Sequence, residues 1–197
     1  KIINNVYAEK IFIKRLKQQI DTIGLLGALR TELMVEGVPF KLIYFKPPST
    51  NNEELIKNYQ QNIFGVTRQL RYDKAQKKSL DMVILVNGFP IFTLELKNQM
   101  TGQNFGDAVK QYKRDRNSNE LIFLTNKRSL VHFALDTEEI HMTTKLAGEK
   151  TFFLPFNRGF NMGKGNPEIK GNYKTSYLWK EIFEKDSVLE LLGQFIF

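Results

Sequence analysis

Apolar and polar positions follow their most regular pattern over residues 79–97, which read SLDMVILVNGFPIFTLELK. Two apolar runs rich in β-branched residues, 82–86 and 89–94, flank Asn87-Gly88, a dipeptide typical of two-residue β-turns. The pattern predicts a β-hairpin. Its open end is charged, because Asp81 opens the first strand and Glu95 and Lys97 close the second.

The register of this hairpin decides whether its carboxylates share a face. Side chains alternate between the two faces of a sheet, so positions two apart on one strand, such as Glu95 and Lys97, share a face. A strict two-residue turn would set Asp81 opposite Leu94 and separate the carboxylates. A three-residue loop, or a one-residue bulge near Pro90, which lacks an N–H for the ladder, sets Asp81 opposite Glu95. We predict this second register.

The rest of the chain alternates between helical and strand patterns. Apolar residues recur at steps of three and four over 7–34, and Gly24 and Gly27 are expected to divide this helix. Further helices are predicted over 53–58, 107–116 and 176–194, further strands over 40–45, 62–72, 121–125, 130–135 and 139–144, and an ordered connector over 152–171. This order favours an α/β fold, with a mixed β-sheet flanked by helices on both sides.

Composition narrows the class of protein. A chain of 197 residues with 42% hydrophobic and 25% charged residues suits one globular domain. The absence of cysteine excludes disulfides and thiolate zinc sites, and no apolar run approaches the roughly 20 residues of a membrane span, so we expect a cytoplasmic protein without a membrane partner. The net charge of +8 favours a polyanion such as DNA or RNA as the partner.

Facing carboxylates at the hairpin end would predict a divalent cation site. Two carboxylates about 4 to 6 Å apart repel each other unless a cation or a proton joins them, and hard oxygen ligands suit Mg²⁺ or Mn²⁺. The backbone carbonyl of Leu96 is a candidate third ligand beside Asp81 and Glu95. Lys97 could then polarise an attacking water or stabilise a phosphorane-like transition state. These parts together predict phosphodiester hydrolysis.

The same residues carry a resemblance to a known family. Asp81 followed by Glu95-Leu96-Lys97 resembles the PD-(D/E)XK nuclease motif. From about residue 62 onward the chain resembles the N-terminal part of the restriction (R) subunit of type I restriction-modification enzymes. The stretches that carry this likeness are NGFPIFTLELKNQ, QYKRDR, LVHFALD, TTKLAGEKTFFLPFNRG, GKGNP and TSYLWKEIFEKDSVLELL. Many hairpins carry the D…ExK spacing by chance, so the ordered flanking motifs are the specific part.

The resemblance implies a restriction-endonuclease-like fold and a defined activity. It implies an endonuclease domain over residues 1–175 and a C-terminal helix over 176–197 that leads towards motor domains outside this chain. We therefore expect this chain to be part of a longer protein. The domain would cut double-stranded DNA with Mg²⁺, or Mn²⁺ as a substitute, after translocation driven by ATP in those motor domains. Modification and specificity subunits would be its partners. Asp81 and Glu95 would be the metal ligands and Lys97 the catalytic cation.

The resemblance also bears on the predicted helix 107–116. Related nucleases carry a Gln and a Tyr four residues apart on this helix, beside the ion site. Tyr112 matches the Tyr position, but Ala108 occupies the Gln position, and Gln111 is the nearest substitute. We therefore expect Gln111 and Tyr112 to support the site. Tyr112 also lies on the apolar stripe of the helix, so a plain core role is the alternative.

Cations near the hairpin are candidates for contacts with the DNA backbone. They are Arg68 and Arg71 on the strand before the hairpin, and Lys113 and Arg114 on the helix after it. Arg116 is expected to extend this basic edge. Solvated surface cations are the alternative interpretation.

Three further questions stay open at this stage. Glu9 or Glu32, expected in the N-terminal helices, is a candidate ligand of a second ion. His132 and His141 are interpreted as structural strand residues with hydrogen-bond partners. The alternatives to a restriction nuclease are a non-catalytic DNA-binding or assembly module of the same fold, and a repair nuclease of the same superfamily.

Overall fold

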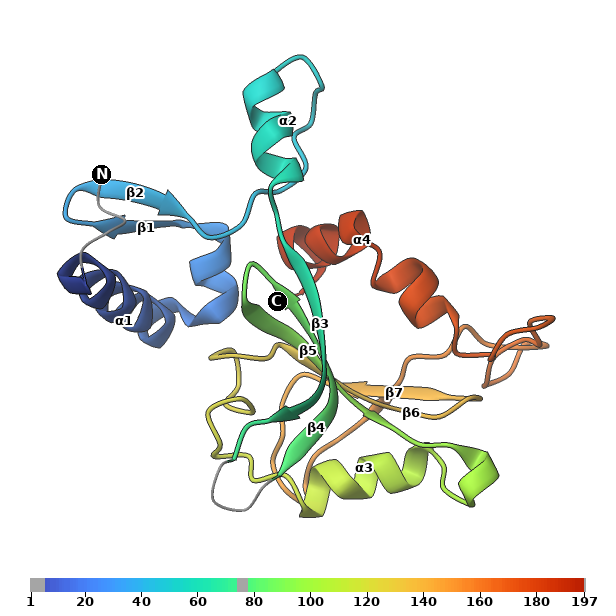
Figure 1. Cartoon of the computed structure of the whole chain (residues 1–197). Helices are drawn as coiled ribbons and strands as arrows, with labels where there is room; N and C mark the ends of the chain where they lie inside the picture. Colours follow the sequence, from blue (N-terminus) through green and yellow to red (C-terminus); the bar gives the residue numbers. More distant parts are fainter. Residues whose placement is uncertain (1–5, 74–77, 197) are drawn as a thin grey trace. The chain divides into compact units, whose positions relative to one another are not determined.

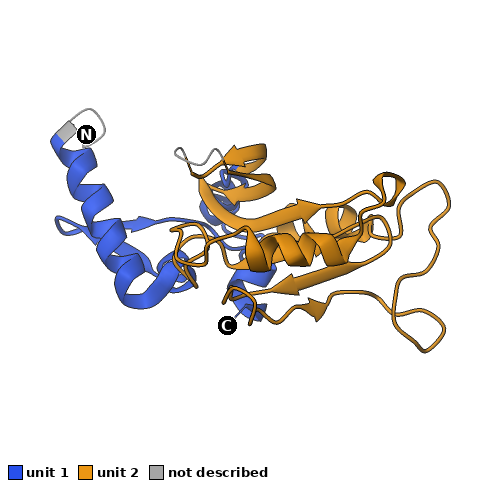
Figure 2. Ribbon diagram, turned by 90° about the horizontal axis from the view of Figure 1, so that it is seen from below, with its two compact units in different colours: residues 1–63, 189–197 blue, residues 64–188 orange. Residues whose placement is uncertain are grey.

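The computed structural model describes residues 6–73 and 78–196. The chain divides into two compact units, one formed by residues 1–63 with 189–197 and the other by residues 64–188 (Figure 2). The lysines at 74 and 77 of the basic turn before the hairpin lie outside the described residues. Within these residues, no helix combines the length and the apolar character needed to cross a membrane.

The first unit begins with helix α1 (Val6–Arg30), which is divided at Gly24, where φ is 77°. Gly27 stays within the helix, so of the two predicted breaks only the one at Gly24 is confirmed. The helix ends at Arg30 rather than Met34, because residues 32–35 are taken into an antiparallel hairpin, β1 (Glu32–Val35) with β2 (Val38–Lys41). Glu36 and Gly37, both with positive φ, make its turn.

Two other predictions in this unit have different outcomes. The strand predicted over 40–45 is wrong, since β2 ends at Lys41 and the apolar residues Leu42 and Ile43 are buried without joining a sheet. Helix α2 (Glu53–Gln60) is confirmed, and the Asn52 side chain caps it by accepting a hydrogen bond from the backbone N–H of Leu55.

The second unit is built on a six-stranded mixed sheet, ordered β3-β4-β5-β6-β7-β8. Figure 1 labels its strands β3 to β7. The strands are β3 (Phe64–Arg71), β4 (Ser79–Val86), β5 (Phe89–Leu96), β6 (Val131–Leu135), β7 (Ile140–Thr143) and β8 (Leu154–Pro155). Only β5 and β6 pair in parallel, as a crossover through helix α3 (Phe105–Arg114) requires. The predicted α/β class with a mixed sheet is confirmed.

Helical segments cover both faces of this sheet. A capping box of Asn104 and Asp107 starts α3, whose Tyr112 packs in a buried cluster with Val83 of β4. On the opposite face, Phe183 follows the π-helical turn η2 (Leu178–Ile182), and its ring stacks 5.3 Å from that of Phe92. This arrangement fixes the β4–β5 hairpin between two layers.

Two predicted elements of this region are wrong. Residues 121–125 form turns, in which the N–H of Phe123 donates to the carbonyl of Glu120 at 2.8 Å instead of joining the sheet. The helix predicted over 176–194 is broken into η2, α4 (Lys185–Glu190) and η3 (Leu191–Phe195). The break follows Phe183, where φ is −92° and ψ is 10°, and the ring of this residue stacks on Phe92 of the sheet. The predicted boundary at residue 176 concerns domains outside the chain and stays a prediction.

Candidate active site

The β4–β5 hairpin contains a tight turn followed by a bulge. Asn87 and Gly88 have φ of 48° and 84°, as the central residues of a type I′ turn require. Leu85 then pairs with Pro90, but the register shifts immediately beyond, which leaves Ile91 as one extra residue on β5. The bulge lies where the missing N–H of proline weakens the ladder.

This bulge brings the two carboxylates to the same place. Beyond it Met82 pairs with Leu94, and the next step of the register sets Asp81 opposite Glu95. The backbone N–H of Leu96 donates to Asp81 Oδ2 at 2.9 Å, which holds the Asp81 carboxylate beside β5. The predicted register is confirmed, and of its two possible causes the structure uses the bulge.

Glu95 is completely buried and is held by two side chains from the α3 region. Arg116 binds Glu95 Oε1 through both Nε, at 2.7 Å, and Nη2, at 2.5 Å. Gln111 Nε2 donates to Glu95 Oε2 at 2.8 Å. The structure therefore brings Asp81, Glu95 and Gln111 together, and it adds Arg116.

Arg116 corrects the expectation of a basic surface edge. Helix α3 ends at Arg114 with Asp115 as its C-cap, so the chain turns and Arg116 points inward, with 7% of its surface exposed. Its Nη2 also donates to the carbonyl of Ser79 at 2.8 Å, and its Nη1 to the hydroxyl of Tyr72 at 3.3 Å. The QYKRDR motif contained this residue, but the sequence carried no signal that it faces the carboxylates.

The electrostatics of the pair follow from burial. Burial raises the pKa of Glu95 to about 8; the positive charge of Arg116 opposes this rise, and the neighbouring Asp81 carboxylate adds to it. The site therefore resists carrying two negative charges, even with one guanidinium in contact. A proton or a further cation between the carboxylates relieves that repulsion.

Gln69 is a second residue that sequence reasoning missed. It lies on β3 with a φ of 50°, and its Nε2 donates to Asp81 Oδ1 at 3.2 Å while its Oε1 accepts from the Ser79 hydroxyl at 3.0 Å. A left-handed Gln in mid-strand has no recognisable sequence signal. Through this contact Gln69 holds the Asp81 oxygen that Leu96 does not bind.

The donor set fits a divalent cation. Asp81 accepts two hydrogen bonds and Glu95 three from neighbouring groups, and the two carboxyl groups also share a hydrogen bond with each other. A metal ion that replaces the shared proton can bind the same facing oxygens. Among residues 6–73 and 78–196 no cluster of three or more His, Cys, Asp or Glu side chains is suited to hold a metal, so protein ligands beyond the pair would have to be backbone groups.

Lys97 directly follows β5 and is partly exposed. Its backbone N–H donates to the carbonyl of Leu135 at 2.9 Å, which fixes its Cα at the end of the parallel pair. The pKa of Asp107 is lowered mainly by a hydrogen bond from the Asn104 backbone, with smaller contributions from Lys110 and Lys97, so the Lys97 charge lies near the start of α3. The roles of Lys97 and of the Leu96 carbonyl stay predictions.

Tyr112 belongs to a neutral cluster next to the carboxylates. Its hydroxyl and the Thr93 hydroxyl are 2.8 Å apart, and Thr93 Oγ1 is 2.7 Å from His132 Nδ1. All three residues are buried, and burial lowers the pKa of His132 to about 3, so the ring is neutral. The core interpretation of Tyr112 and the structural one of His132 are confirmed; the supporting role of Tyr112 stays a prediction.

The family of the chain follows from comparison with known proteins. The model of the family described as type I restriction enzyme R protein N terminus matches residues 1–151. The chain belongs to this family. The matched range includes the whole β4–β5 hairpin, helix α3 and Arg116, so the carboxylate site lies within the region that the family model describes.

Individual relatives carry names that agree with this family. A protein of Methanocaldococcus jannaschii named as a type I restriction enzyme endonuclease subunit is 22% identical over 160 residues, which cover 75% of this chain and 14% of the relative. A type I restriction enzyme endonuclease subunit of Staphylococcus aureus (strain COL) is 36% identical over 63 residues, 32% of this chain and 7% of that protein. The chain thus spans about a seventh or less of the relatives it matches.

The remaining predicted residues of this R protein N terminus lie outside the carboxylate pair. Arg68 and Arg71 are exposed on β3, Lys113 is partly exposed, and Arg114 pairs with Glu149 at 2.8 Å. Their contacts with DNA stay predictions. Glu9 is in α1 as expected, but Glu32 is the first residue of strand β1, which corrects its placement in a helix.

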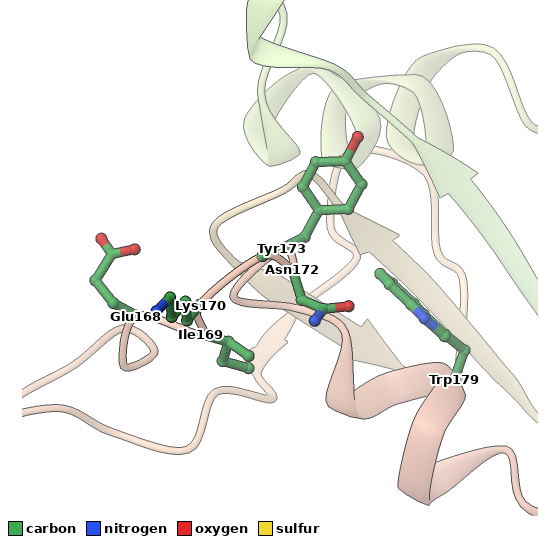
Figure 3. Close-up of a pocket in the computed structure, with 7 residues that line it drawn as sticks. Glu168, Ile169, Lys170, Asn172, Tyr173 and Trp179 are labelled. Carbon is green, nitrogen blue, oxygen red and sulfur yellow. The ribbon is translucent and has the colours of Figure 1, made fainter.

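A separate hollow of about 900 Å³ lies along residues 168–173 and Trp179 (Figure 3). The rings of Tyr173 and Trp179 stand 6.5 Å apart in a T-shaped arrangement. Its acidic residue, Glu168, is paired with Lys174 at 2.8 Å. Glu168 is the one acidic residue among the described residues that line this hollow, so the hollow has no pair of facing carboxylates like the one at the hairpin end.

Proposed function

We propose that residues 64–188 form a Mg²⁺-dependent nuclease that hydrolyses phosphodiester bonds of double-stranded DNA. One observation carries the proposal: the bulge at Ile91 sets Asp81 opposite Glu95 on a hairpin that continues directly into Lys97. The family supports it, because its relatives are named as endonuclease subunits of restriction enzymes. The family match also favours the restriction alternative over a repair nuclease.

Each residue has a stated role in this proposal. Asp81 and the Oε2 side of Glu95 would hold Mg²⁺, with the Leu96 carbonyl as a third ligand and Mn²⁺ as a possible substitute. When bound, the ion acts as a Lewis acid and lowers the pKa of a coordinated water. Lys97 stabilises the negative charge that develops on the phosphate. Gln111 holds Glu95 Oε2 in place by donating to it at 2.8 Å.

The setting of the reaction is proposed from the family. The longer protein would be cytoplasmic, would join modification and specificity subunits, and would bring DNA to this site by ATP-driven translocation in motor domains beyond this chain. Cutting would then take place away from the recognised sequence. Arg68, Arg71, Lys113 and Arg114 are proposed to contact the DNA backbone during cutting.

The test uses the reconstituted enzyme of the longer protein. Asp81→Ala, Glu95→Ala and Lys97→Ala should each lower DNA cleavage at least about a hundredfold, more than the loss of an outer-shell partner of a metal ligand costs. ATP hydrolysis should persist in all three. Lys150→Ala, an exposed charge change in the same unit, is the matched control. Cleavage retained by the Asp81 and Glu95 variants would refute the assignment.

A second function is favoured by one observation. Glu95 has no exposed surface and is already paired with Arg116, as in a purely structural ion pair. The chain could then be a non-catalytic DNA-binding or assembly module. Titration calorimetry with Mn²⁺ and a short duplex separates the two: the nuclease predicts binding that Glu95→Ala abolishes, and the module predicts equal behaviour of both proteins.

A further inference from the structure

We propose that Arg116 is a charge-balancing and positioning residue, which makes ion binding at Asp81 and Glu95 depend on a phosphate group of bound DNA. The inference rests on the proposed nuclease function and deepens it. It concerns the order in which the site is filled: the carboxylate pair would bind a divalent cation weakly alone and tightly only when DNA supplies a further negative charge.

The first step is that Arg116 is a fixed part of the site. Its guanidinium donates to Glu95 Oε1 twice, to the Ser79 carbonyl and to the Tyr72 hydroxyl, and its charge lies 5.7 Å from the centre of the Tyr72 ring. Every nitrogen of the fork therefore has a partner. Only 6% of the side-chain surface is exposed, so solvent ions cannot easily take its place.

The second step is a count of charge. When both are ionised, as ion binding requires, Asp81 and Glu95 bring two negative charges, and Arg116, in contact with Glu95, offsets one of them. The site then has one net negative charge, whereas divalent-cation sites owe much of their affinity to the number of charged ligands. A phosphodiester oxygen is the ligand that would add negative charge to the site.

The third step concerns geometry. Arg116 takes Oε1 of Glu95 with two donors, and Gln111 contacts Oε2, so the carboxylate has one orientation with Oε2 as the oxygen left for an ion. A planar guanidinium fixes a carboxylate in this way, but an ammonium group does not. Charge balance and orientation can therefore be separated by comparing Arg116→Lys with Arg116→Gln.

The experiment measures Mn²⁺ affinity of the 197-residue chain by titration calorimetry, with and without a short DNA duplex. For the wild type, the duplex should tighten Mn²⁺ binding at least about tenfold, since one unit charge at contact distance is worth more than this even in a screened site. Arg116→Gln should bind Mn²⁺ about tenfold more tightly without DNA, and so lose most of the effect of the duplex. Arg116→Lys should keep the dependence on DNA, because it keeps the charge.

The outcomes separate this inference from the function on which it rests. Mn²⁺ binding that is unchanged in Glu95→Ala would refute the ion site itself. Binding that needs Glu95 but is equally tight with and without DNA, or an Arg116→Gln protein that behaves as wild type, would refute only the role of Arg116. Should Arg116→Gln fail to fold, Gln69→Glu carries the test, because a negative charge added beside Asp81 must also tighten DNA-free binding; no gain would refute the charge argument.

Discussion

Strand β5 contributes to two neighbouring polar clusters on its α3 side, and the clusters differ in charge and in their capacity to bind a cation. In the neutral cluster of Thr93, Tyr112 and His132, hydrogen bonds of 2.7 and 2.8 Å join uncharged groups, and His132 Nε2 is buried without a hydrogen-bond partner among the described residues. Two residues further along the strand, Glu95 belongs to a charged cluster with Asp81 and Arg116, where burial and a second carboxylate raise its pKa. The neutral cluster specifies packing, whereas the charged one keeps binding capacity for a cation.

The largest loss in the free energy of unfolding is expected when Arg116 is removed from the charged cluster. Arg116→Ala leaves Glu95 buried without its cation, so we expect a loss of about 3–5 kcal/mol in the free energy of unfolding. Denaturant titration at pH 9, where Glu95 of the folded wild type is ionised, measures it. Arg114→Ala is the matched control, since Arg114 is an exposed arginine two positions away. A loss below about 1 kcal/mol for Arg116→Ala would show that the pair is not a buried charge pair.

The pH dependence should distinguish the two clusters next. Because the pKa of Glu95 is raised from 4.5 to about 8, folded protein holds a proton that the unfolded chain releases, and this contribution to stability is present below pH 4.5 and lost as pH rises to 8. The stability of wild type relative to Glu95→Gln should therefore fall between pH 5 and pH 8, by an amount on the order of a few kcal/mol. Denaturant titrations at several pH values measure this difference, and a constant one contradicts the pKa shift.

A smaller effect is expected from the neutral cluster. Thr93→Val keeps the shape of the side chain but leaves Tyr112 Oη and His132 Nδ1 without their shared partner, which should cost about 1–3 kcal/mol. Between pH 7 and pH 8 this cost should be constant, because the cluster carries no charge there. Thr93→Ser, which keeps the hydroxyl, is the control. A cost that changes across this range would mean that the two clusters share a proton.

The smallest effect should come from the surface. Arg114 and Glu149 form an ion pair at 2.8 Å, but about two thirds of each side chain is exposed. Arg114→Ala should change the free energy of unfolding by about 0–1 kcal/mol. If Arg114 contacts DNA as proposed, the same variant should weaken duplex binding and reduce its dependence on salt. Duplex titrations at two salt concentrations measure this, and unchanged binding contradicts the contact.

The sequence predicted the local parts of this arrangement and missed the distant ones. Asn87-Gly88 and Pro90 encode the turn and the bulge within a few residues, so the register of Asp81 and Glu95 could be predicted. Arg116 could not, because its direction depends on where α3 ends and on a carboxylate 21 residues earlier in the chain. The Arg116 side chain can point inward and pair with Glu95 only once α3 has packed on the sheet.

The wrong elements have a similar cause. Residues 121–125 have a strand-like composition, but their N–H groups are satisfied within turns, and Phe123 is buried without joining a sheet. Residues 32–35 continue a helical apolar spacing, but the turn at Glu36 and Gly37 pairs them with β2. Apolar spacing therefore identified residues that are buried, and tertiary hydrogen bonding decided their backbone conformation.

The bulge at Ile91 makes the number of residues in the hairpin a chemical variable in its own right. Because Ile91 is the extra residue on β5, its deletion would leave a regular two-residue hairpin in which Glu95 still lies opposite Asp81. A second deletion in β5 would have no extra residue to remove, and it would set Leu96 opposite Asp81 in place of Glu95. The bulge therefore gives this hairpin a tolerance of one residue in length before the carboxylate leaves the site.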